Sequence, residues 1–506
     1  MVSRPKFFSK LIGLLICMIV VGQSEIASAQ GVQYWSSQQR IPGYSNDTEP
    51  PFLIADQNHF VHAFTSQWLA QNIGQSELAI IYSRWTPDQG WTKPNDIILS
   101  PYKHRAQILS VFLDPTGIFH LIFLGGDNTG ASIYYTKASE TDVDKASAWS
   151  TPVEIGENAQ SPGSGAIVGD DKGKLTILFA GIQDGNGVYV SSSSDRGSSW
   201  SNPELIFLAP NDQPVIYNLQ LYLGRSGWLH AVWNDLNVSG QGRSIYYARA
   251  KIGDIQWNEP IKLADSQSGY GVLTPAIIEY QNVLFALFNR TPQIIMRRSN
   301  DDGATWADPV VPFENHIGVN GTLSLVVDGE NELNLFFGQR IPGSPDIHGM
   351  WHAIWQTDGW SVPEPVESGP RIMTGDNQSF DPFNARAASV DNVLLVTWRT
   401  DPGNGVANNN GVWYSFKSVG PGTSLGQSST ASQLTPTTSL QSATPTPPPK
   451  SVAEYPYISP SVINNNSTMF KGFVNLSDPL SAVGLGIIPV LLMIIGIIIL
   501  TRRSHH

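Results

Sequence analysis

Four arginines could supply guanidinium groups to a single anion-binding site. Three of them follow the same kind of apolar strand in successive repeats: Arg290 in FNRTP, Arg340 in GQRIP and Arg399 in WRTDP. Arg40, in QRIPGY, lies in a loop that we expect on the same face. Guanidinium groups that converge on one cleft bind a carboxylate through paired hydrogen bonds. The candidate ligand-binding residues are Arg40, Arg290, Arg340, Arg399, Asp235 and Asp401.

Spacing alone selects no catalytic residues. A tyrosine beside a carboxylate could act as a nucleophile, with another carboxyl group as the acid. The tyrosines considered are Tyr44, Tyr102 and Tyr270, and the loop acids are Asp127, Asp235 and Asp401. In a purely structural interpretation, the arginines instead form ion pairs with loop acids such as Asp381 or Asp401. Anion binding, hydrolysis and ion pairing are therefore all open interpretations of the row of arginines formed by Arg290, Arg340 and Arg399.

The composition argues against several classes of function. The net charge is −12 and charged residues make up only 14% of the chain, whereas nucleic-acid binding needs basic patches that displace counterions. The sequence contains no Walker loop, no dinucleotide-type glycine pattern and no Cys/His spacing typical of a metal site. We therefore expect no cofactor, no metal ion and no nucleic-acid partner.

A repeated unit must position the candidate residues. The pattern Trp-x-x-Pro begins at Trp91, Trp149, Trp200, Trp257, Trp306 and Trp360, with a near-copy at Trp35. Trp35 and Trp360 are 325 residues apart, and six intervals give about 54 residues for each repeat. Each unit contains an apolar run such as IFHLIF (118–123) and then an aromatic run such as IYYT (133–136). Such β-branched and aromatic runs, bounded by Gly, Asn, Asp and Pro, predict strands.

Short antiparallel strands in groups of four predict an all-β protein, a seven-bladed β-propeller over residues 30–418. The last unit ends at VWYSF (412–416) without a fourth strand, and QYWSSQ (33–38) precedes the first unit. We therefore expect the N-terminal segment to complete the last sheet and close the ring. His62, His120 and His230 share one position of the repeat, so they are predicted to be packing residues and not metal ligands.

Two octapeptides resemble a motif of a known family. SNDDGATW (299–306) and SSDRGSSW (193–200) resemble the Asp-box, or BNR repeat, of the sialidase-like propellers. The matched residues, expected to be structural, are Ser193, Asp195, Gly197, Trp200, Ser299, Asp301, Gly303 and Trp306. In such a turn Asp accepts backbone N–H bonds, Gly adopts a positive φ and Trp packs between blades. The resemblance implies that these turns lie on the face opposite the ligand site.

The resemblance also bears on function. Arg40-Ile41-Pro42 resembles the Arg-Ile-Pro motif that provides the first of three carboxylate-binding arginines in sialidases, with Gln39 in place of the aromatic residue before it. Those enzymes have six blades, and their acid/base aspartate has no evident counterpart here. The leading hypothesis is a propeller that recognises a glycan or another anionic surface ligand. The alternatives are a sialidase-type exo-glycosidase that hydrolyses terminal sialic acid or a related sugar, and a scaffold for a protein partner.

Both ends of the chain differ from the propeller in composition. The predicted segments are a signal peptide (1–29), the propeller (30–418), a Ser/Thr/Pro-rich disordered stalk (419–478), a transmembrane helix (479–500) and a cytoplasmic tail (501–506). Arg502 and Arg503 would keep that tail in the cytoplasm. We therefore expect an exported, single-pass membrane protein with its propeller outside. Cys17 is the only cysteine, so the mature chain can form no internal disulfide bond.

Overall fold

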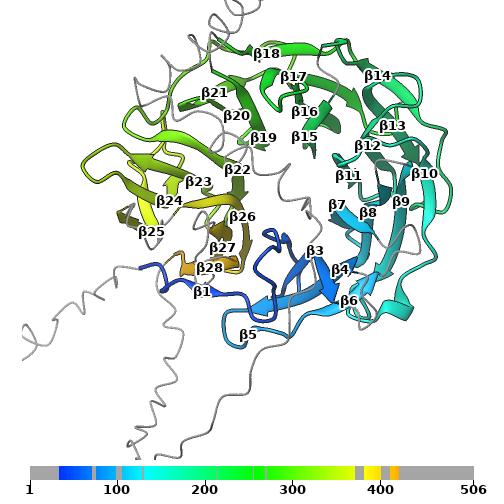
Figure 1. Cartoon of the computed structure of the whole chain (residues 1–506), viewed down its shortest axis with the longest axis horizontal. Coiled ribbons are helices and arrows are strands. Elements are labelled where there is room, and N and C mark those ends of the chain that lie inside the picture. The colour runs from blue at the N-terminus through cyan, green and yellow to red at the C-terminus, as the bar shows by residue number, and fades with distance from the viewer. Residues whose placement is uncertain are drawn as a thin grey trace, which may run out of the picture.

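The computed structural model shows a ring of seven antiparallel sheets around a central axis (Figure 1). It describes residues 34–420 except 71–75, 99–104, 128–129, 213–214, 255, 268–269, 371–380 and 401–410. The predicted seven-bladed, all-β propeller is confirmed. Within the described residues the secondary structure is β-strand, apart from one short 3-10 turn at Ala146–Ala148.

The blades follow one another in chain order. The first contains β2 (Phe52–Ala55), β3 (Val61–Ala70), β4 (Ser76–Thr86), β5 (Gly90–Trp91) and β6 (Asn95–Ile98). The second contains β7 (Ala106–Leu113), β8 (Ile118–Asp127), β9 (Gly130–Ser139) and β10 (Val153–Gly156). The third contains β11 (Gly165–Gly169), β12 (Leu175–Gly181), β13 (Gly187–Ser193) and β14 (Glu204–Leu208). The fourth contains β15 (Val215–Leu223), β16 (Trp228–Leu236), β17 (Gly242–Lys251) and β18 (Ile261–Asp265).

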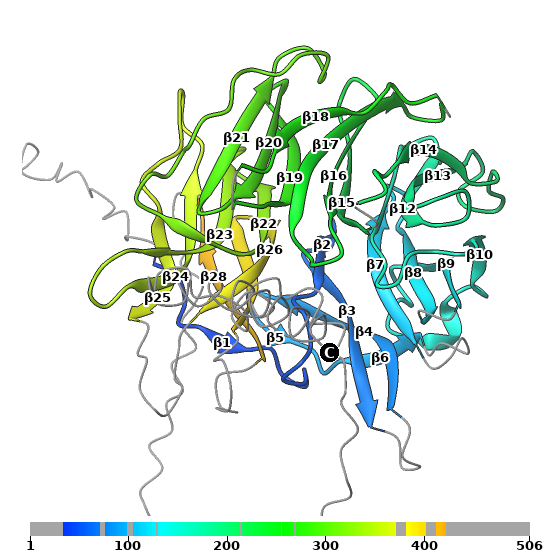
Figure 2. The ribbon, with the colours of Figure 1, turned by 45° about the horizontal axis from the view of Figure 1, so that its top comes forward.

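The remaining blades complete the circle. The fifth contains β19 (Val272–Tyr280), β20 (Val283–Arg290) and β21 (Gln293–Ser299). The sixth contains β22 (Ile317–Val327), β23 (Leu333–Ile341), β24 (Ile347–Ile354) and β25 (Glu364–Pro370). The seventh contains β26 (Pro382–Val390), β27 (Val393–Thr400), β28 (Gly411–Ser418) and, from the beginning of the chain, β1 (Gln39–Arg40). The first strand of each blade lies nearest the axis, as Figure 2 shows for β15 and β19.

The second strand of each blade is buried on both sides. All residues of β12 and β27 are buried, which explains why most of their residues are apolar. Successive side chains of this strand point alternately towards the two neighbouring blades. Phe336 of β23 belongs to the same buried cluster as Val396 of the seventh blade, whereas Phe337 shares a cluster with Leu287 of the fifth. Burial of one such ring contributes about 2–3 kcal/mol, so the blades are held together by their shared apolar faces.

The ring is closed by the N-terminal segment, as the sequence predicts. In the pairing of β1 with β28, Gln39 lies opposite Tyr414 and Arg40 opposite Trp413. Three residues before β1, the Ser36 amide donates a hydrogen bond to the carbonyl of Phe416 at 2.9 Å. The closing segment therefore replaces the fourth strand that the last repeat lacks.

The fifth blade departs from the predicted four strands. Its outer position holds only an isolated bridge between Met296 and Val310. The segment that would form the strand contains Pro312 in addition to Pro309, the proline of the Trp-x-x-Pro pattern that also precedes the outer strand in other blades. Pro312 has no amide hydrogen to donate to a ladder, which explains why only a single bridge forms.

The octapeptide turns have the geometry expected from their residues. Asp301 Oδ1 accepts hydrogen bonds from the Thr305 amide at 2.9 Å and from Ser299 Oγ at 2.7 Å. Gly303 has a φ of +78°, and the ring of Trp306 lies 5.0 Å from that of Tyr247 in the preceding blade. Equivalent contacts in the turn at 193–200 involve Ser193, Asp195, Gly197, Ser199, Trp200 and Tyr135. These turns join a blade to its neighbour.

The repeated histidines are buried packing residues, as predicted. Nδ1 of His62, His120 and His230 is hydrogen-bonded to the hydroxyl of Tyr82, Tyr135 and Tyr247, at 2.8, 2.7 and 2.8 Å respectively. Burial lowers the pKa of all three imidazoles. They are therefore neutral hydrogen-bonding parts of the core at neutral pH.

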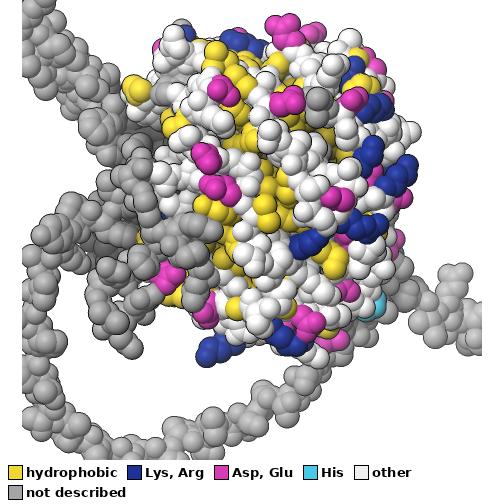
Figure 3. Space-filling model, turned by 90° about the vertical axis from the view of Figure 1, so that its right-hand side faces the viewer, with side chains coloured by type: hydrophobic (Ala, Val, Ile, Leu, Met, Phe, Trp, Pro, Cys, Tyr) yellow, Lys and Arg dark blue, Asp and Glu magenta, His cyan; other side chains and the backbone are white. Residues whose placement is uncertain are grey.

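Apolar side chains reach the surface on the outer edge of the ring. Val153 on β10 and Leu208 on β14 are 47% and 59% exposed, and Figure 3 shows apolar side chains exposed on this side of the molecule. Among the described residues no helix is long and apolar enough to cross a membrane. The predicted signal peptide, transmembrane helix and cytoplasmic tail lie outside the described residues.

Candidate functional site

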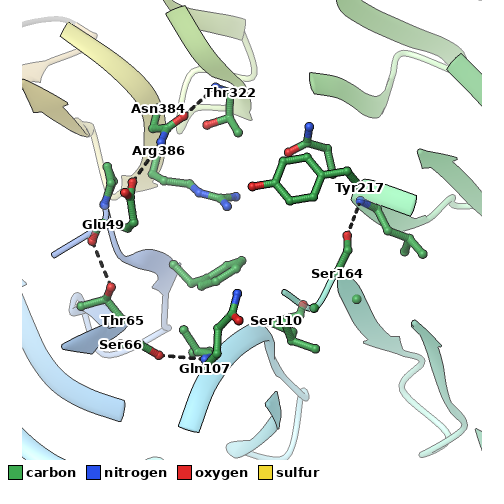
Figure 4. A pocket seen from close by; sticks show the side chains of 18 of the residues that line it. Glu49, Thr65, Ser66, Gln107, Ser110, Ser164, Tyr217, Thr322, Asn384 and Arg386 are labelled. Atoms are coloured by element: carbon green, nitrogen blue, oxygen red, sulfur yellow. Dashed lines mark hydrogen bonds between the residues drawn. The ribbon is translucent and has the colours of Figure 1, made fainter. Parts of the chain in front are cut away.

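A pocket of about 350 Å³ lies on the axis of the ring. The first strand of every blade contributes to its wall (Figure 4). One lining residue from each blade in turn is Phe52, Gln107, Gly165, Tyr217, Thr274, Thr322 and Arg386. A volume of this size suits one small ligand, so the described structure offers a site for a compact chemical group.

Four consecutive inner strands are bulged where they reach the pocket. Asn218, Thr274, Gly321 and Asn384 have φ values of 49°, 52°, 75° and 55°. Each lies where the register between the first two strands of its blade is broken. The left-handed conformation costs a non-glycine residue about 1–2 kcal/mol. Asn218, Thr274 and Asn384 carry this cost at the pocket wall, and such bulges re-aim neighbouring side chains.

Arg386 extends from β26 into the pocket (Figure 4). Its guanidinium carbon lies 4.4 Å from the centre of the Phe52 ring, so the planar group is supported by an aromatic face. No hydrogen bond or ion pair joins this guanidinium to the residues that the structure describes. Burial lowers the pKa of Arg386 to about 10, against the opposing effect of Glu49. Arg386 therefore remains a cation at neutral pH, with its N–H groups available.

Tyr217 approaches from the opposite wall, and its phenol points towards Arg386 (Figure 4). The hydroxyl is buried without a hydrogen-bond partner. Burial raises the pKa of Tyr217, and the negative charge of Glu49 raises it further. The hydroxyl is therefore protonated and able to donate. The side-chain oxygen of Gln107 is also buried in the pocket wall without a partner, and such orphaned groups mark places where a ligand or water completes the hydrogen bonding.

Glu49 also lines the pocket, but both of its carboxylate oxygens are occupied. Oε1 accepts a short hydrogen bond from Arg399, which is 6% exposed. Oε2 accepts from Asn384 Nδ2 at 2.9 Å. The Glu49 carbonyl accepts from Thr65 Oγ1 at 3.0 Å. Glu49 is thereby fixed against the wall formed by the seventh and first blades.

The structure does not bring the four predicted arginines together at the pocket. Arg399 lies behind Glu49 and is ion-paired with it. Arg340 lies 3.4 Å from Asp346, and Arg40 donates to Asn46 at 2.5 Å. Arg290 is half-buried at the end of β20. None of the four is among the residues that line the axial pocket, and their role in ligand binding stays a prediction.

The predicted acids and tyrosines are also dispersed. Asp235 is fully buried and accepts from the Ser244 amide at 2.8 Å; burial raises its pKa, against the effect of its hydrogen bonds. Tyr44 is buried and hydrogen-bonded to Ser83 at 3.1 Å, and Tyr270 is 49% exposed. Asp401 and Tyr102 lie outside the described residues, as does the side chain of Asp127.

Three residues of the pocket were not singled out from the sequence: Arg386, Tyr217 and Glu49. Arg386 lies in FNARAAS, where a single charged residue interrupts an innermost strand. This charged residue in a strand that faces the axis was the one feature of the sequence that could have identified Arg386 as a pocket residue. Within the described residues, no group of at least three His, Cys, Asp or Glu residues could hold a metal ion. The pocket instead offers a free cation, a hydroxyl donor and aromatic faces, a combination that binds an anionic, partly apolar group.

No family model matches the chain, and no curated protein matches it. Several solved structures are similar to the chain at low sequence identity. A protein of unknown function from Dyadobacter fermentans is 14% identical, with a TM-score of 0.45 over 77% of this chain and 100% of that one. A leech intramolecular trans-sialidase is 11% identical, with a TM-score of 0.41 over 77% and 70% of the two chains. An ulvan lyase is 11% identical, with a TM-score of 0.48 over 74% and 95%. These similarities concern the fold alone.

Proposed function

We propose that this protein recognises a glycan through the axial pocket, and that the group it binds there carries a negative charge. The observation that carries the proposal is the pair formed by Arg386 and Tyr217. A buried hydroxyl without a partner faces a guanidinium group that forms no hydrogen bond with the described residues. Leaving such groups unpaired costs about 1–3 kcal/mol for each neutral group, a cost that a bound anion removes.

Aromatic rings support a sugar as the ligand. Phe52 and Phe383 line the pocket beside the amide of Gln107. Sugar rings present apolar C–H faces and a rim of hydroxyl groups, which suit a pocket that combines aromatic faces with a few placed polar groups. The octapeptide turns fit the proposed relationship to Asp-box propellers. We retain export and a C-terminal membrane tether as part of the proposal, to be tested by fractionation of cells that express the full chain.

Glu49 favours recognition over hydrolysis. The usual glycosidase mechanism needs two carboxyl groups that are free to act on the bond. Besides Glu49, Asp47 is the other carboxylate among the residues that line the pocket. Both oxygens of Glu49 are engaged by Arg399 and Asn384. A fluorogenic sialoside assay on the full chain tests the hydrolytic alternative directly.

Calorimetric titration of the full chain with sialyllactose, a glucuronate-terminated disaccharide and neutral lactose tests the proposal. We expect an acidic sugar to bind more tightly than lactose. Arg386→Met should weaken acidic binding by about 1.5–3 kcal/mol, the usual contribution of a hydrogen bond to a charged group, which is about tenfold to a hundredfold. Arg225→Met is the matched control, because Arg225 is exposed and lies outside the pocket, and it should bind like the wild type. Equal affinity of Arg386→Met and the wild type for every acidic sugar would overturn the proposal.

A further inference from the structure

Glu49 and Arg386 share the axial pocket without pairing with each other. The charge of Glu49 is close enough to raise the pKa of Arg386 against the effect of burial. Opposite charges so close in a partly buried site attract strongly. The guanidinium group of Arg386 nevertheless makes no hydrogen bond with the described residues, while both oxygens of Glu49 accept hydrogen bonds from other side chains.

We infer that Arg399 and Asn384 are positioning residues that hold Glu49 away from Arg386 and thereby set the charge preference of the pocket. Arg399 neutralises Glu49 from behind, so that Arg386 is the one cation among the described lining residues and faces the ligand. The inference rests on the proposed function, because it explains why an anion is preferred. Neither positioning residue needs to touch the ligand through its charged or amide group.

The local backbone fixes this arrangement. Asn384 adopts a left-handed conformation with a φ of 55°, which asparagine tolerates better than most residues. Its Oδ1 accepts from the Thr322 amide of the preceding blade at 3.1 Å, and its Nδ2 donates to Glu49 at 2.9 Å. Arg399 lies opposite Phe383 in the β26–β27 ladder, immediately before the bulge. The bulge therefore places both partners of Glu49 side by side.

The consequence of removing Arg399 follows from charge balance. Glu49 would lose its main neutralising partner inside a partly buried site, where an unpaired carboxylate is unfavourable. Arg386 is the remaining cation in the pocket wall. The carboxylate of Glu49 would turn to it, and the pocket would then contain an internal ion pair in place of a free cation. Acidic ligands would have to compete with Glu49 for the same N–H groups.

A rescue experiment tests the inference on the full chain, with sialyllactose and a glucuronate-terminated disaccharide as acidic probes and lactose as the neutral probe. Arg399→Met should weaken acidic binding by about tenfold or more, with little change for lactose. Glu49→Gln should strengthen acidic binding severalfold. The double variant Glu49→Gln/Arg399→Met should return to the wild-type affinity or above it, because residue 49 no longer carries a charge that can capture Arg386.

Asn384→Gly provides a second route if Arg399→Met fails to fold. Glycine accepts the φ of 55° and removes the amide donor to Glu49, so we expect a smaller loss of acidic binding that Glu49→Gln again reverses. Circular dichroism confirms that each variant is folded. The inference is overturned if the folded positioning variants bind acidic probes like the wild type, or if Glu49→Gln does not rescue them. Absence of acidic binding by the wild-type chain would instead remove the proposed function itself.

Discussion

Glu364 joins residues from three distant parts of the chain at a single oxygen atom. Its Oε1 accepts hydrogen bonds from Trp35 Nε1 at 3.0 Å and from Lys417 Nζ at 2.7 Å, and it lies 2.8 Å from His352 Nδ1. Burial alone would raise the pKa of Glu364, but these partners hold it at about 2. The unfolded pKa is about 4.3. The carboxylate therefore adds stability above that pH, and this stability is lost as the pH falls towards 2.

Glu364→Gln should lower the free energy of unfolding by about 1 kcal/mol at pH 7, after allowance for solvent screening of a side chain that is 43% exposed. The deficit should shrink towards pH 2.5, where the wild-type carboxylate begins to take up a proton. Urea unfolding of the wild type and the variant at pH 7 and at about pH 2.5 measures this difference in the free energy of unfolding. Glu314→Gln, at an exposed position, should change neither value, and an equal deficit for Glu364→Gln at both pH values would contradict the assignment.

At the scale of elements, the turns that follow the third strand of a blade use glycine for two separate reasons. Gly303 needs a positive φ, and a Cβ atom there would lie 1.7 Å from the hydroxyl of Tyr247. Gly90, in the corresponding turn of the first blade, has a φ of +68° and nothing within 4 Å of a Cβ atom. Both glycines have a positive φ, but only Gly303 lies close to a neighbouring blade. Comparing substitutions at the two positions therefore distinguishes the cost of backbone strain from the cost of a steric clash.

Gly90→Ala should therefore cost about 1 kcal/mol, from backbone strain alone. Gly303→Ala should cost about 1–3 kcal/mol more, because the added methyl group must displace Tyr247 and loosen the contact between two blades. Chemical denaturation of both variants gives the comparison. The interpretation of Gly303 as a close-packing position is wrong if the two substitutions are equally destabilising.

The strands and turns could be predicted from the sequence, but the site could not. Repeated apolar runs mark the second strand of a blade because both of its faces are buried. The inner strands are different: in β26, Asn384 and Ala385 together lie where β27 offers only Trp398. This bulge shifts the alternation of side chains by one residue. The two-residue alternation of a strand therefore no longer predicts which side chains face the axis. Arg386 also does not recur at one position of the repeat, unlike Arg290, Arg340 and Arg399.

At the scale of the whole molecule, the number of blades and the closure follow from counting repeats. The seventh repeat lacks an outer strand, and an unpaired strand precedes the first repeat. Pairing the two closes the ring. Trp35 packs against Phe336 and His352, with ring centres 5.6 and 5.3 Å apart. The closing segment is thus anchored to the sixth blade as well as paired with the seventh.

Trp35→Ala should lower the free energy of unfolding by about 2–3 kcal/mol, somewhat less than for a fully buried tryptophan. It should also weaken sugar binding, because the closing segment leads directly into the loop that carries Glu49. Tyr34→Ala is the matched control, since Tyr34 is 79% exposed. Calorimetric unfolding and sugar titration check both effects. A stable Trp35→Ala protein with full affinity would show that the closing segment and the pocket are independent.

Pairing between Arg399 and Glu49 spans 350 residues of sequence. A chain emerging from the ribosome has therefore made the acidic wall of its pocket long before it has made the arginine that neutralises it. Contacts this distant in sequence form slowly, so the proposed site is unfinished in the nascent protein while its earlier blades assemble. The proposed site is therefore complete only once the final sheet has formed and Arg399 meets Glu49 from the beginning of the ring.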